Sequence, residues 1–573
     1  MKPLFLLPIA VCITFACSPP QHQAKTFCNP LNLDYRYQLE EPSRREAADP
    51  VIVLFQDRYC LFASKSGGYW VSENLIDWSL IVPTGLPLED YAPAALEING
   101  KLYFTAFNSG AIYTTDDPLA GVWTKVADTP NYADPALFLD DDGRLYMYDG
   151  CSNNGPIYVQ EMDPNTFELI GERIECFSPD YKNRGWEVFG DDNLGGDMDG
   201  RIQYSPWDEG PWMNRYNGVY YLQYAAPGTQ WKSYADGVYT ATSPLGPFEY
   251  APYSPFAHKP TGFITGAGHG NTFQGKDGRY WHIGTMVISV AHMFERRLGL
   301  YPVGFDSDGQ MFSNSYLADF PQKVPGSAND PARDNLAGWM LLSYGKETIV
   351  SSSLDGYPPA YAVDEEVRTW WSAVTGDSGE WLAVNLGKPC DVYAIQTNFA
   401  DQGTDAFGRE EKHYHQYEVR VSDDGLAWRS IIDKSENQKD VPHDYVELEK
   451  PVTTQFVKIE NIHMPARGTF AISGFRVFGL ASGDVPTLVQ NSSAKRDPDD
   501  LRRVHIEWKA AQNATGYVIR YGIAPKKLYN NYQVYKQTQL SINSLNTGID
   551  YFYTIDSFNE SGITRGEQVF RMR

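Results

Sequence analysis

Three short acidic motifs recur along the first half of the chain and could carry acid–base chemistry. Asp49 and Asp134 each stand in Ala-Asp-Pro, and Glu209 opens Glu-Gly-Pro. When carboxyl groups crowd together, their repulsion raises the pKa of at least one, so that one stays protonated while another is ionised. A protonated acid beside an ionised base is the pair that general acid–base catalysis needs.

A shared register predicts that these side chains are brought together. Four residues each stand 10 to 12 positions before the tyrosine of a turn-and-strand signature: Asp49 before Tyr59, Asp134 before Tyr146, Glu209 before Tyr220 and His269 before Tyr280. Ala92 fills the same slot before Tyr103. Each signature predicts a hairpin entering a β-strand. The repeat of about 40 to 75 residues is typical of four-stranded propeller blades.

In a propeller, residues at one register of successive blades converge at one mouth of the central channel. We therefore expect Asp49, Asp134, Glu209 and His269 to meet there. Taken singly, each motif is ordinary turn or loop chemistry. Independent turns have no reason to keep one register, so the set together favours a catalytic site. Its protonated acid and ionised base are what glycoside hydrolysis requires.

These motifs, with Gly-His269-Gly, resemble glycoside hydrolase family 43 over roughly residues 35 to 325. The resemblance implies a five-bladed β-propeller in which Asp49 is the general base and Glu209 the general acid. It makes Asp134 the residue that positions the acid and tunes its pKa. In the segment 295–303, Arg296 aligns best with the family's sugar-contacting arginine, and Arg297 is the alternative.

The resemblance also implies sugar contacts and an ion. Tyr91 stands where many family members have a tryptophan, and Trp212 follows the Glu-Gly-Pro motif, so both are expected substrate contacts together with His269 and Arg296. A central calcium that involves His269 through water is implied too. One histidine is a weak signature for Ca²⁺, which prefers several oxygen ligands, and a structural loop histidine is the alternative.

Composition narrows the class of partner. The 573 residues suggest three or four domains, and the formal net charge is −24. So acidic a protein is unsuited to nucleic acid or anionic membranes, where basic patches dominate affinity. The chain is 14% aromatic, which suits carbohydrate binding, although ordinary β-sheet composition explains most of these rings.

The N-terminus predicts export and a lipid anchor. Residues 1–16 form an apolar signal too short for a stable transmembrane helix, and Cys17 follows them. This resembles a bacterial lipoprotein signal, which implies lipid on Cys17, a tether over 17–34 and attachment to the outer membrane, at its periplasmic side or the cell surface. An ordinary cleaved signal is the alternative. The remaining cysteines give neither a disulfide framework nor a zinc pattern.

Two further β modules are predicted after the propeller domain at 35–328. Residues 331–480, with Thr-Trp370-Trp371-Ser and the strand-like 380–387, resemble the discoidin (factor V/VIII type C) β-sandwich, a jelly roll. Relatives attached to glycosidases often bind sugars, and a structural spacer is the alternative. Residues 484–573 alternate apolar and polar side chains and resemble a fibronectin type III domain, which we interpret as a spacer.

The sequence thus predicts an all-β protein, and the resemblance implies its function. That function is an inverting, exo-acting glycoside hydrolase removing a terminal pentose, α-L-arabinofuranose or β-D-xylose, from plant polysaccharide side chains. A galactan-directed exo-glycosidase and a noncatalytic carbohydrate-binding surface protein are the alternatives. Asp49 weighs against the first, because the galactan subgroup generally lacks this base. The intact acidic set weighs against the second.

Overall fold

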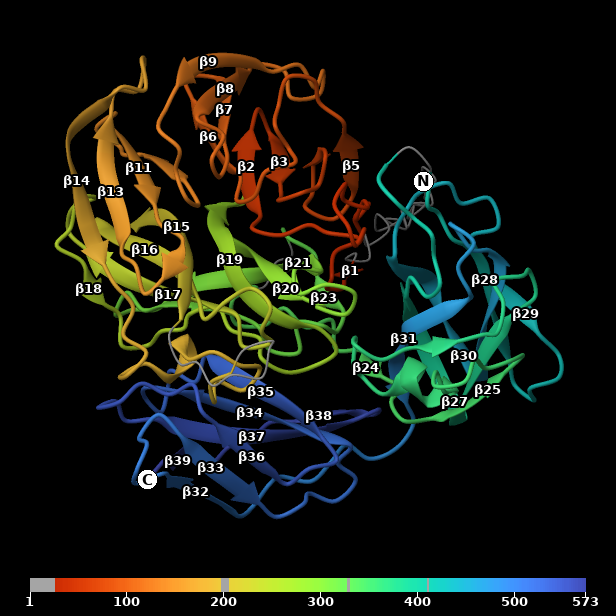
Figure 1. Ribbon diagram of the computed structural model, residues 1–573. Helices are drawn as coiled ribbons and strands as arrows, with labels where there is room; N and C mark the ends of the chain where they lie inside the picture. The colour runs from red at the N-terminus through yellow and green to blue at the C-terminus, as the bar shows by residue number, and fades with distance from the viewer. Residues whose placement is uncertain (1–25, 197–205, 327–329, 410–411) are drawn as a thin grey trace, which may run out of the picture.

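A computed structural model describes residues 26–196, 206–326, 330–409 and 412–573 (Figure 1). The described residues contain β-strands and two short 3₁₀ helices, η1 (Gly185–Glu187) and η2 (Pro359–Val363), and no α-helix. They therefore include no helix able to cross a membrane. The all-β prediction is confirmed.

Five antiparallel sheets make up the first half of the chain. The first contains β2 (Val51–Phe55), β3 (Arg58–Phe62), β4 (Tyr69–Ser72) and β5 (Trp78–Ile81). The second contains β6 (Ala94–Ile98), β7 (Lys101–Thr105), β8 (Ala111–Thr115) and β9 (Thr124–Asp128). The third contains β10 (Ala136–Leu139), β11 (Leu145–Asp149), β13 (Ile157–Met162) and β14 (Leu169–Phe177). The fourth contains β12 (Ser152–Asn153), β15 (Trp207–Tyr216), β16 (Val219–Ala226), β17 (Ala235–Ala241) and β18 (Glu249–Tyr250). The fifth contains β19 (Thr265–Gln274), β20 (Tyr280–Val287), β21 (Arg296–Phe305) and β22 (Met311–Ser313).

The first main strands of the five sheets close into a ring. β2 contacts β6, β6 contacts β10, β10 contacts β15, β15 contacts β19, and β19 returns to β2. The five sheets are therefore the blades of a propeller, as predicted, and β2, β6, β10, β15 and β19 surround its channel (Figure 1).

Tight hairpins set the register between paired strands within three of the blades. The turns Gln56-Asp57, Asn99-Gly100 and Asn217-Gly218 each join two strands through two residues, and both residues of each turn have positive φ. This is the type I′ geometry, whose twist matches that of the flanking strands. These turns lie in three of the signatures from which the repeat was predicted.

The segment before the first blade, residues 26–35, packs against the propeller and is not a flexible tether; we call it the clasp. Phe27, Leu31, Leu33 and Tyr35 are almost fully buried in one core cluster with residues of blades one and five, including Trp70 and Trp281. The clasp also forms β1 (Thr26–Phe27), which pairs with β23 (Gln322–Lys323). The predicted tether over 17–34 is thus wrong for residues 26–34, because their apolar side chains close the seam of the ring. Cys17 lies outside the described residues.

The middle sandwich (residues 340–481) follows the propeller (Figure 1). Its sheet contains β24 (Met340–Leu341), β25 (Glu347–Val350), β26 (Trp371–Ser372), β27 (Trp381–Phe399), β28 (Gln416–Ser422), β29 (Arg429–Asp433), β30 (His443–His463) and β31 (Ala471–Ala481). Trp371, Val384, Ile459 and Phe475 are among the fully buried residues of its core. The predicted domain boundary at 328–331 lies between β23 and β24, partly outside the described residues.

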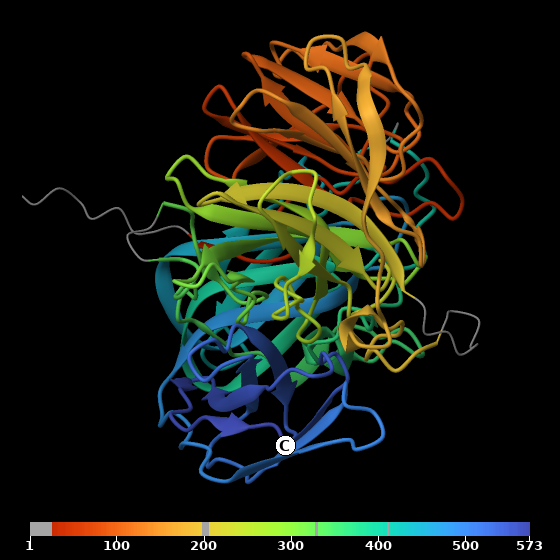
Figure 2. The same ribbon diagram turned by 90° about the vertical axis from the view of Figure 1, so that its left-hand side faces the viewer.

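The C-terminal sandwich (residues 492–571) packs two sheets around one core and lies beneath both other domains (Figures 1 and 2). One sheet contains β32 (Ser492–Arg496), β33 (Val504–Trp508) and β36 (Gln539–Ile542). The other contains β34 (Gly516–Gly522), β35 (Asn530–Tyr535), β37 (Phe552–Asn559), β38 (Gly562–Thr564) and β39 (Phe570–Arg571). The specific fibronectin type III resemblance stays a prediction.

Candidate active site

A backbone corner repeats in every blade, shortly before the inner strand in blades one to three and within it in blades four and five. It is marked by a residue with left-handed φ in each blade: Asp49 (49°), Ala92 (44°), Asp134 (48°), Gly210 (60°) and His269 (41°). In β15 and β19 the corner coincides with a break in strand pairing, as in a β-bulge. Such irregularities re-aim side chains and are concentrated next to active sites. The predicted common register is therefore a common corner.

The fourth blade departs from the pattern by one residue. Its corner residue is Gly210, and Glu209 precedes it. A Cβ atom at Gly210 would lie 2.5 Å from Cδ2 of His269, so the imidazole occupies the space that any side chain would need. Glycine supplies both the positive φ and the close approach at this position.

Asp49 is held as an ionised carboxylate. Ser64 Oγ donates a 2.6 Å hydrogen bond to Asp49 Oδ2, and Arg296 Nη1 lies 3.3 Å from Oδ1. The Nδ1 atom of His269 is also 3.3 Å from Oδ1. Burial alone would raise the pKa of Asp49, but the charges of Arg296 and His269 and the bond from Ser64 outweigh it and lower the pKa.

Glu209 has the opposite environment. The side chain is buried, Tyr234 Oη donates a hydrogen bond to Oε1, and the Cys151 thiol lies 3.4 Å from Oε2. Burial and then the charge of Asp49 raise the pKa of Glu209, against the opposing charge of His269 and the bonds from Tyr234 and Cys151. A carboxyl group of this kind retains its proton and can donate it.

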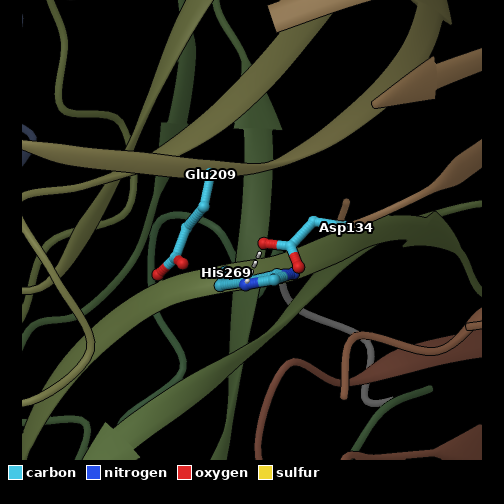
Figure 3. Close-up of side chains that lie close together, drawn as sticks. All are labelled: Asp134, Glu209 and His269. Atoms are coloured by element: carbon cyan, nitrogen blue, oxygen red, sulfur yellow. Dashed lines mark ion pairs between the residues drawn. The ribbon is translucent and has the colours of Figure 1, made fainter. Parts of the chain in front are cut away.

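The His269 ring lies beside both Asp49 and Asp134. His269 Nδ1 is 3.6 Å from Asp134 Oδ2, and Figure 3 shows Glu209 and Asp134 on either side of the imidazole. Burial, with the charges of Glu209 and Asp49, raises the pKa of Asp134 to about 7. Burial would lower the pKa of His269, but the surrounding carboxylates raise it, so the ring carries a positive charge that partly neutralises the cluster.

The two candidate arginines point in opposite directions from β21. Besides Asp49, Arg296 bonds Thr229 Oγ1 at 3.1 Å and pairs with Glu46. Arg297 instead donates from Nε to His443 Nε2 of the middle sandwich at 2.9 Å. Neighbouring residues of a strand face opposite sides, so only Arg296 can serve the pocket.

The pocket has a volume of about 290 Å³, and five of the fifteen residues that line it are Phe, Tyr or Trp. Its lining contains Asp49, Asp134, Glu209, His269, Arg296 and Tyr91, together with Phe107, Cys151, Phe189, Trp207, Gly228, Thr229, Gln230, Met293 and Phe294. Trp212 is not among these residues. Its indole nitrogen donates to the Thr272 carbonyl of the neighbouring blade at 3.1 Å, so its ring packs between blades.

Three side chains that contact Asp49 or Glu209 carry no signature in the sequence. Ser64 and Tyr234 bond the two key carboxyl groups, and Cys151 lies between Glu209 and the Trp207 indole, whose nitrogen is 3.2 Å from its sulfur. Ser64 and Cys151 follow the second strands of blades one and three, β3 and β11. Comparing blades at the ends of their second strands, as well as at the entrances of their first, would have drawn attention to both.

One group of three side chains among the described residues could hold a metal ion. Asp134, Glu209 and His269 have ligand atoms within 4.8 Å of one another. They offer two carboxyl groups and one nitrogen, whereas Ca²⁺ takes six to eight oxygens, and the His269 nitrogen already faces two carboxylates. These side chains do not fit a calcium site by direct ligation. An ion bound through water near His269 stays a prediction.

Comparison with known proteins identifies the two larger units. Residues 43–311 match the profile described as glycosyl hydrolases family 43, and residues 347–472 match the F5/8 type C domain. The residues that match the family 43 profile lie in the propeller, and those that match the F5/8 type C domain lie in the middle sandwich. Both predicted resemblances are confirmed.

Individual relatives match only part of the chain. A xylosidase/arabinosidase of Butyrivibrio fibrisolvens is 29% identical over 213 residues, 34% of this chain and 37% of that protein. A non-reducing end alpha-L-arabinofuranosidase of Bacteroides ovatus is 27% identical over 265 residues, 42% of this chain and 45% of that protein. The matches thus span less than half the length of these two relatives. A solved structure described as a glycoside hydrolase covers 75% of this chain and 97% of its own, at 18% identity and a TM-score of 0.45.

Proposed function

We propose that this chain, through its family 43 glycosyl hydrolase domain, is an inverting exo-glycosidase that removes a terminal pentose from plant polysaccharide side chains. One observation carries the proposal. Asp49 and Glu209 line one pocket, and their surroundings lower the pKa of Asp49 and raise that of Glu209. Two carboxyl groups with opposite protonation states are the requirement for glycoside hydrolysis.

The proposed reaction assigns a proton step to each group. Glu209 donates its proton to the glycosidic oxygen as the bond to the anomeric carbon breaks. Asp49 takes a proton from the water that attacks that carbon from the opposite face, which inverts its configuration. The positively charged His269 keeps the base ionised, and repulsion between Asp134 and Glu209 favours the protonated form of the acid. Arg296 binds a sugar hydroxyl and holds Asp49.

Pocket size and relatives support the substrate class. A volume of about 290 Å³ is at the lower end for small-molecule sites and suits a single terminal sugar rather than a bound chain. Aromatic rings such as Tyr91 and Phe294 offer flat apolar surfaces for the C–H faces of that sugar. The relatives above are described as xylosidase/arabinosidase and arabinofuranosidase, which favours α-L-arabinofuranose or β-D-xylose.

Turnover of aryl glycosides tests the proposal. We expect release of the aryl group from α-L-arabinofuranoside or β-D-xyloside, and proton NMR of the first product should show the inverted anomer. Turnover of galactosides alone would favour the galactan-directed alternative. Absence of turnover on every glycoside, with retained binding of polymer, would favour a noncatalytic carbohydrate-binding protein.

We also propose that the protein is a lipoprotein attached to the outer membrane. The support is the sequence alone: an apolar run ends at residue 16, and Cys17 follows it directly. Anchoring at this cysteine would keep the enzyme beside the cell that takes up the released sugar.

A further inference from the structure

We propose that the middle sandwich positions the active-site loops through Arg368 and Arg409, so that it is part of the hydrolytic machinery and not a separable sugar-binding module. The inference rests on the proposed function. Its starting point is that the two arginines reach the propeller at two different sets of loops, and both sets supply residues of the pocket.

Arg368 holds the loops that carry Phe189 and Gln230. Its Nη1 donates to Asp191 Oδ2 at 2.8 Å, and its Nε donates to the Ile288 carbonyl at 2.9 Å. Asp191 in turn accepts a 2.8 Å bond from the Lys232 backbone nitrogen. The guanidinium therefore links the loop after η1 to the residue that follows β20, and Asp191 links the loop after η1 to the loop between β16 and β17.

A second ion pair reinforces the same contact. Lys232 Nζ donates to Glu366 Oε2 at 2.5 Å, and Glu366 lies two residues before Arg368. Asp191, Lys232, Glu366 and Arg368 thus form a network of alternating charges across the domain boundary. The residue between the two sandwich charges, Val367, is buried in a core cluster of the propeller. Because Val367 is buried, this network fixes the middle sandwich relative to the propeller more firmly than an isolated surface ion pair would.

Arg409 holds loops in blades one and two. Its guanidinium pairs with Glu89 and donates to the Lys65 carbonyl at 2.5 Å, and the side chain is 9% exposed. Lys65 Nζ lies 4.4 Å from the centre of the Tyr91 ring, which lines the pocket. Arg409 therefore ties together the two loops that place Tyr91.

The same two loops hold the proposed base. Ser64, the neighbour of Lys65, donates to Asp49 and accepts a 2.7 Å bond from the Ala92 nitrogen, which follows Tyr91. A shift of either loop would lengthen the bond that keeps Asp49 oriented. Arg409 is accordingly a positioning residue for the base, and Arg368 is one for the pocket wall.

Full-length variants test the proposal, because replacing the two arginines should change different kinetic constants. Arg409→Gln should chiefly lower kcat, because Ser64 no longer orients Asp49, and Arg368→Gln should chiefly raise KM, because Phe189 and Gln230 are no longer held. A misplacement of about 1 Å costs up to about 100-fold, so we expect effects of about 10- to 100-fold on an aryl pentoside. Arg420→Gln is the matched control, because Arg420 pairs with Glu418 and Glu460 inside the middle sandwich.

Amide hydrogen exchange tests the clamp independently of activity. In folded Arg368→Gln, residues 188–192 and 229–232 should exchange faster than in the wild type, and in Arg409→Gln residues 63–67 and 88–92 should do so. An unchanged exchange rate in these loops would overturn the proposal, even in an active enzyme. Faster exchange in a protein without glycosidase activity would support the clamp while rejecting the proposed function.

A charge exchange separates positioning from general stability. Lys232→Glu and Glu366→Lys should each raise KM, and the double variant should restore it, because the pair is re-formed with reversed sign. Additive losses in the double variant, or kinetics of Arg368→Gln and Arg409→Gln equal to those of Arg420→Gln, would show that the middle sandwich does not position the pocket.

Discussion

At the scale of single residues, the site depends on how one cluster of carboxyl groups divides its protons. Asp49 faces two cationic side chains and a hydroxyl donor, whereas Glu209 faces a phenol and a thiol. Because the cationic partners favour ionisation at Asp49 and burial disfavours it at Glu209, the pKa values of the two groups are shifted in the directions that the proposed roles of base and acid require.

Replacing the proposed acid and replacing the proposed base should affect substrates with good and poor leaving groups differently. Glu209→Ala should slow substrates with poor leaving groups far more than activated aryl glycosides, which depart with little protonation. Asp49→Ala should slow both alike, because every substrate needs its water deprotonated. Each loss should be about 10² to 10⁴ in kcat/KM, measured with a series of aryl pentosides of graded leaving-group pKa. Equal losses across the series for a folded Glu209→Ala would refute its assignment as the acid.

Removal of the His269 charge should move the whole pH profile. The imidazolium lowers the pKa of both Asp49 and Glu209. In His269→Asn both values therefore rise, so the acidic limb, set by the base, and the basic limb, set by the acid, both shift to higher pH. One charge at this distance shifts a pKa by about one unit or more, which sets the expected displacement of kcat/KM against pH. A profile that narrows or moves to lower pH would contradict this assignment.

At the scale of elements, the repeated corner explains why the sequence predicted so much of the site. Asp49, Asp134 and His269 each occupy the left-handed position of a blade, and a similar spacing of 10 to 12 positions to the next signature tyrosine made them recognisable. The one-residue offset in blade four was not predictable, because it arises from contact between Gly210 and the His269 ring, far apart in sequence. Trp212 was misleading for a related reason, since an aromatic residue beside a motif packs equally well between blades.

Gly210→Ala tests the corner directly. The added Cβ meets the His269 imidazole at a positive φ of 60°, so we expect activity to fall sharply while the fold survives. Gly218→Ala, in the hairpin of the same strand pair, is the matched control, because it has a φ of 81° but no atom within 4 Å of an added Cβ. Thermal denaturation and kcat/KM measured on both variants separate the two effects. Equal losses of activity would show that backbone strain alone matters.

At the scale of the whole molecule, buried polar contacts join the three domains to one another. Arg476 of the middle sandwich pairs with Glu365 and contacts the Asp319 carbonyl at the end of the propeller. Tyr316 of that propeller segment bonds Asp556 of the C-terminal sandwich at 3.0 Å. The sequence predicted three modules from their separate patterns. It could not predict their joints, because the residues that make them are far apart in the sequence, by 80 positions for Arg368 and Ile288 and by 240 for Tyr316 and Asp556.

The proposed anchor is tested by cell fractionation. Cys17→Ala should move the protein from the membrane fraction to the soluble fraction, since lipid on this residue is the proposed attachment. Cys12→Ala, a change within the preceding apolar run, should leave the protein with the membranes. Membrane retention of Cys17→Ala would place the attachment elsewhere.

The clasp has a mechanical consequence. No strand of blade one is shared with blade five, and residues 26–35 bind across the seam between them. A pulling load applied at the N-terminal end is therefore carried first by β1 and its two paired residues, and next by the seam. Tension from that end would open the ring between β19 and β2, the strands whose corners hold His269 and Asp49.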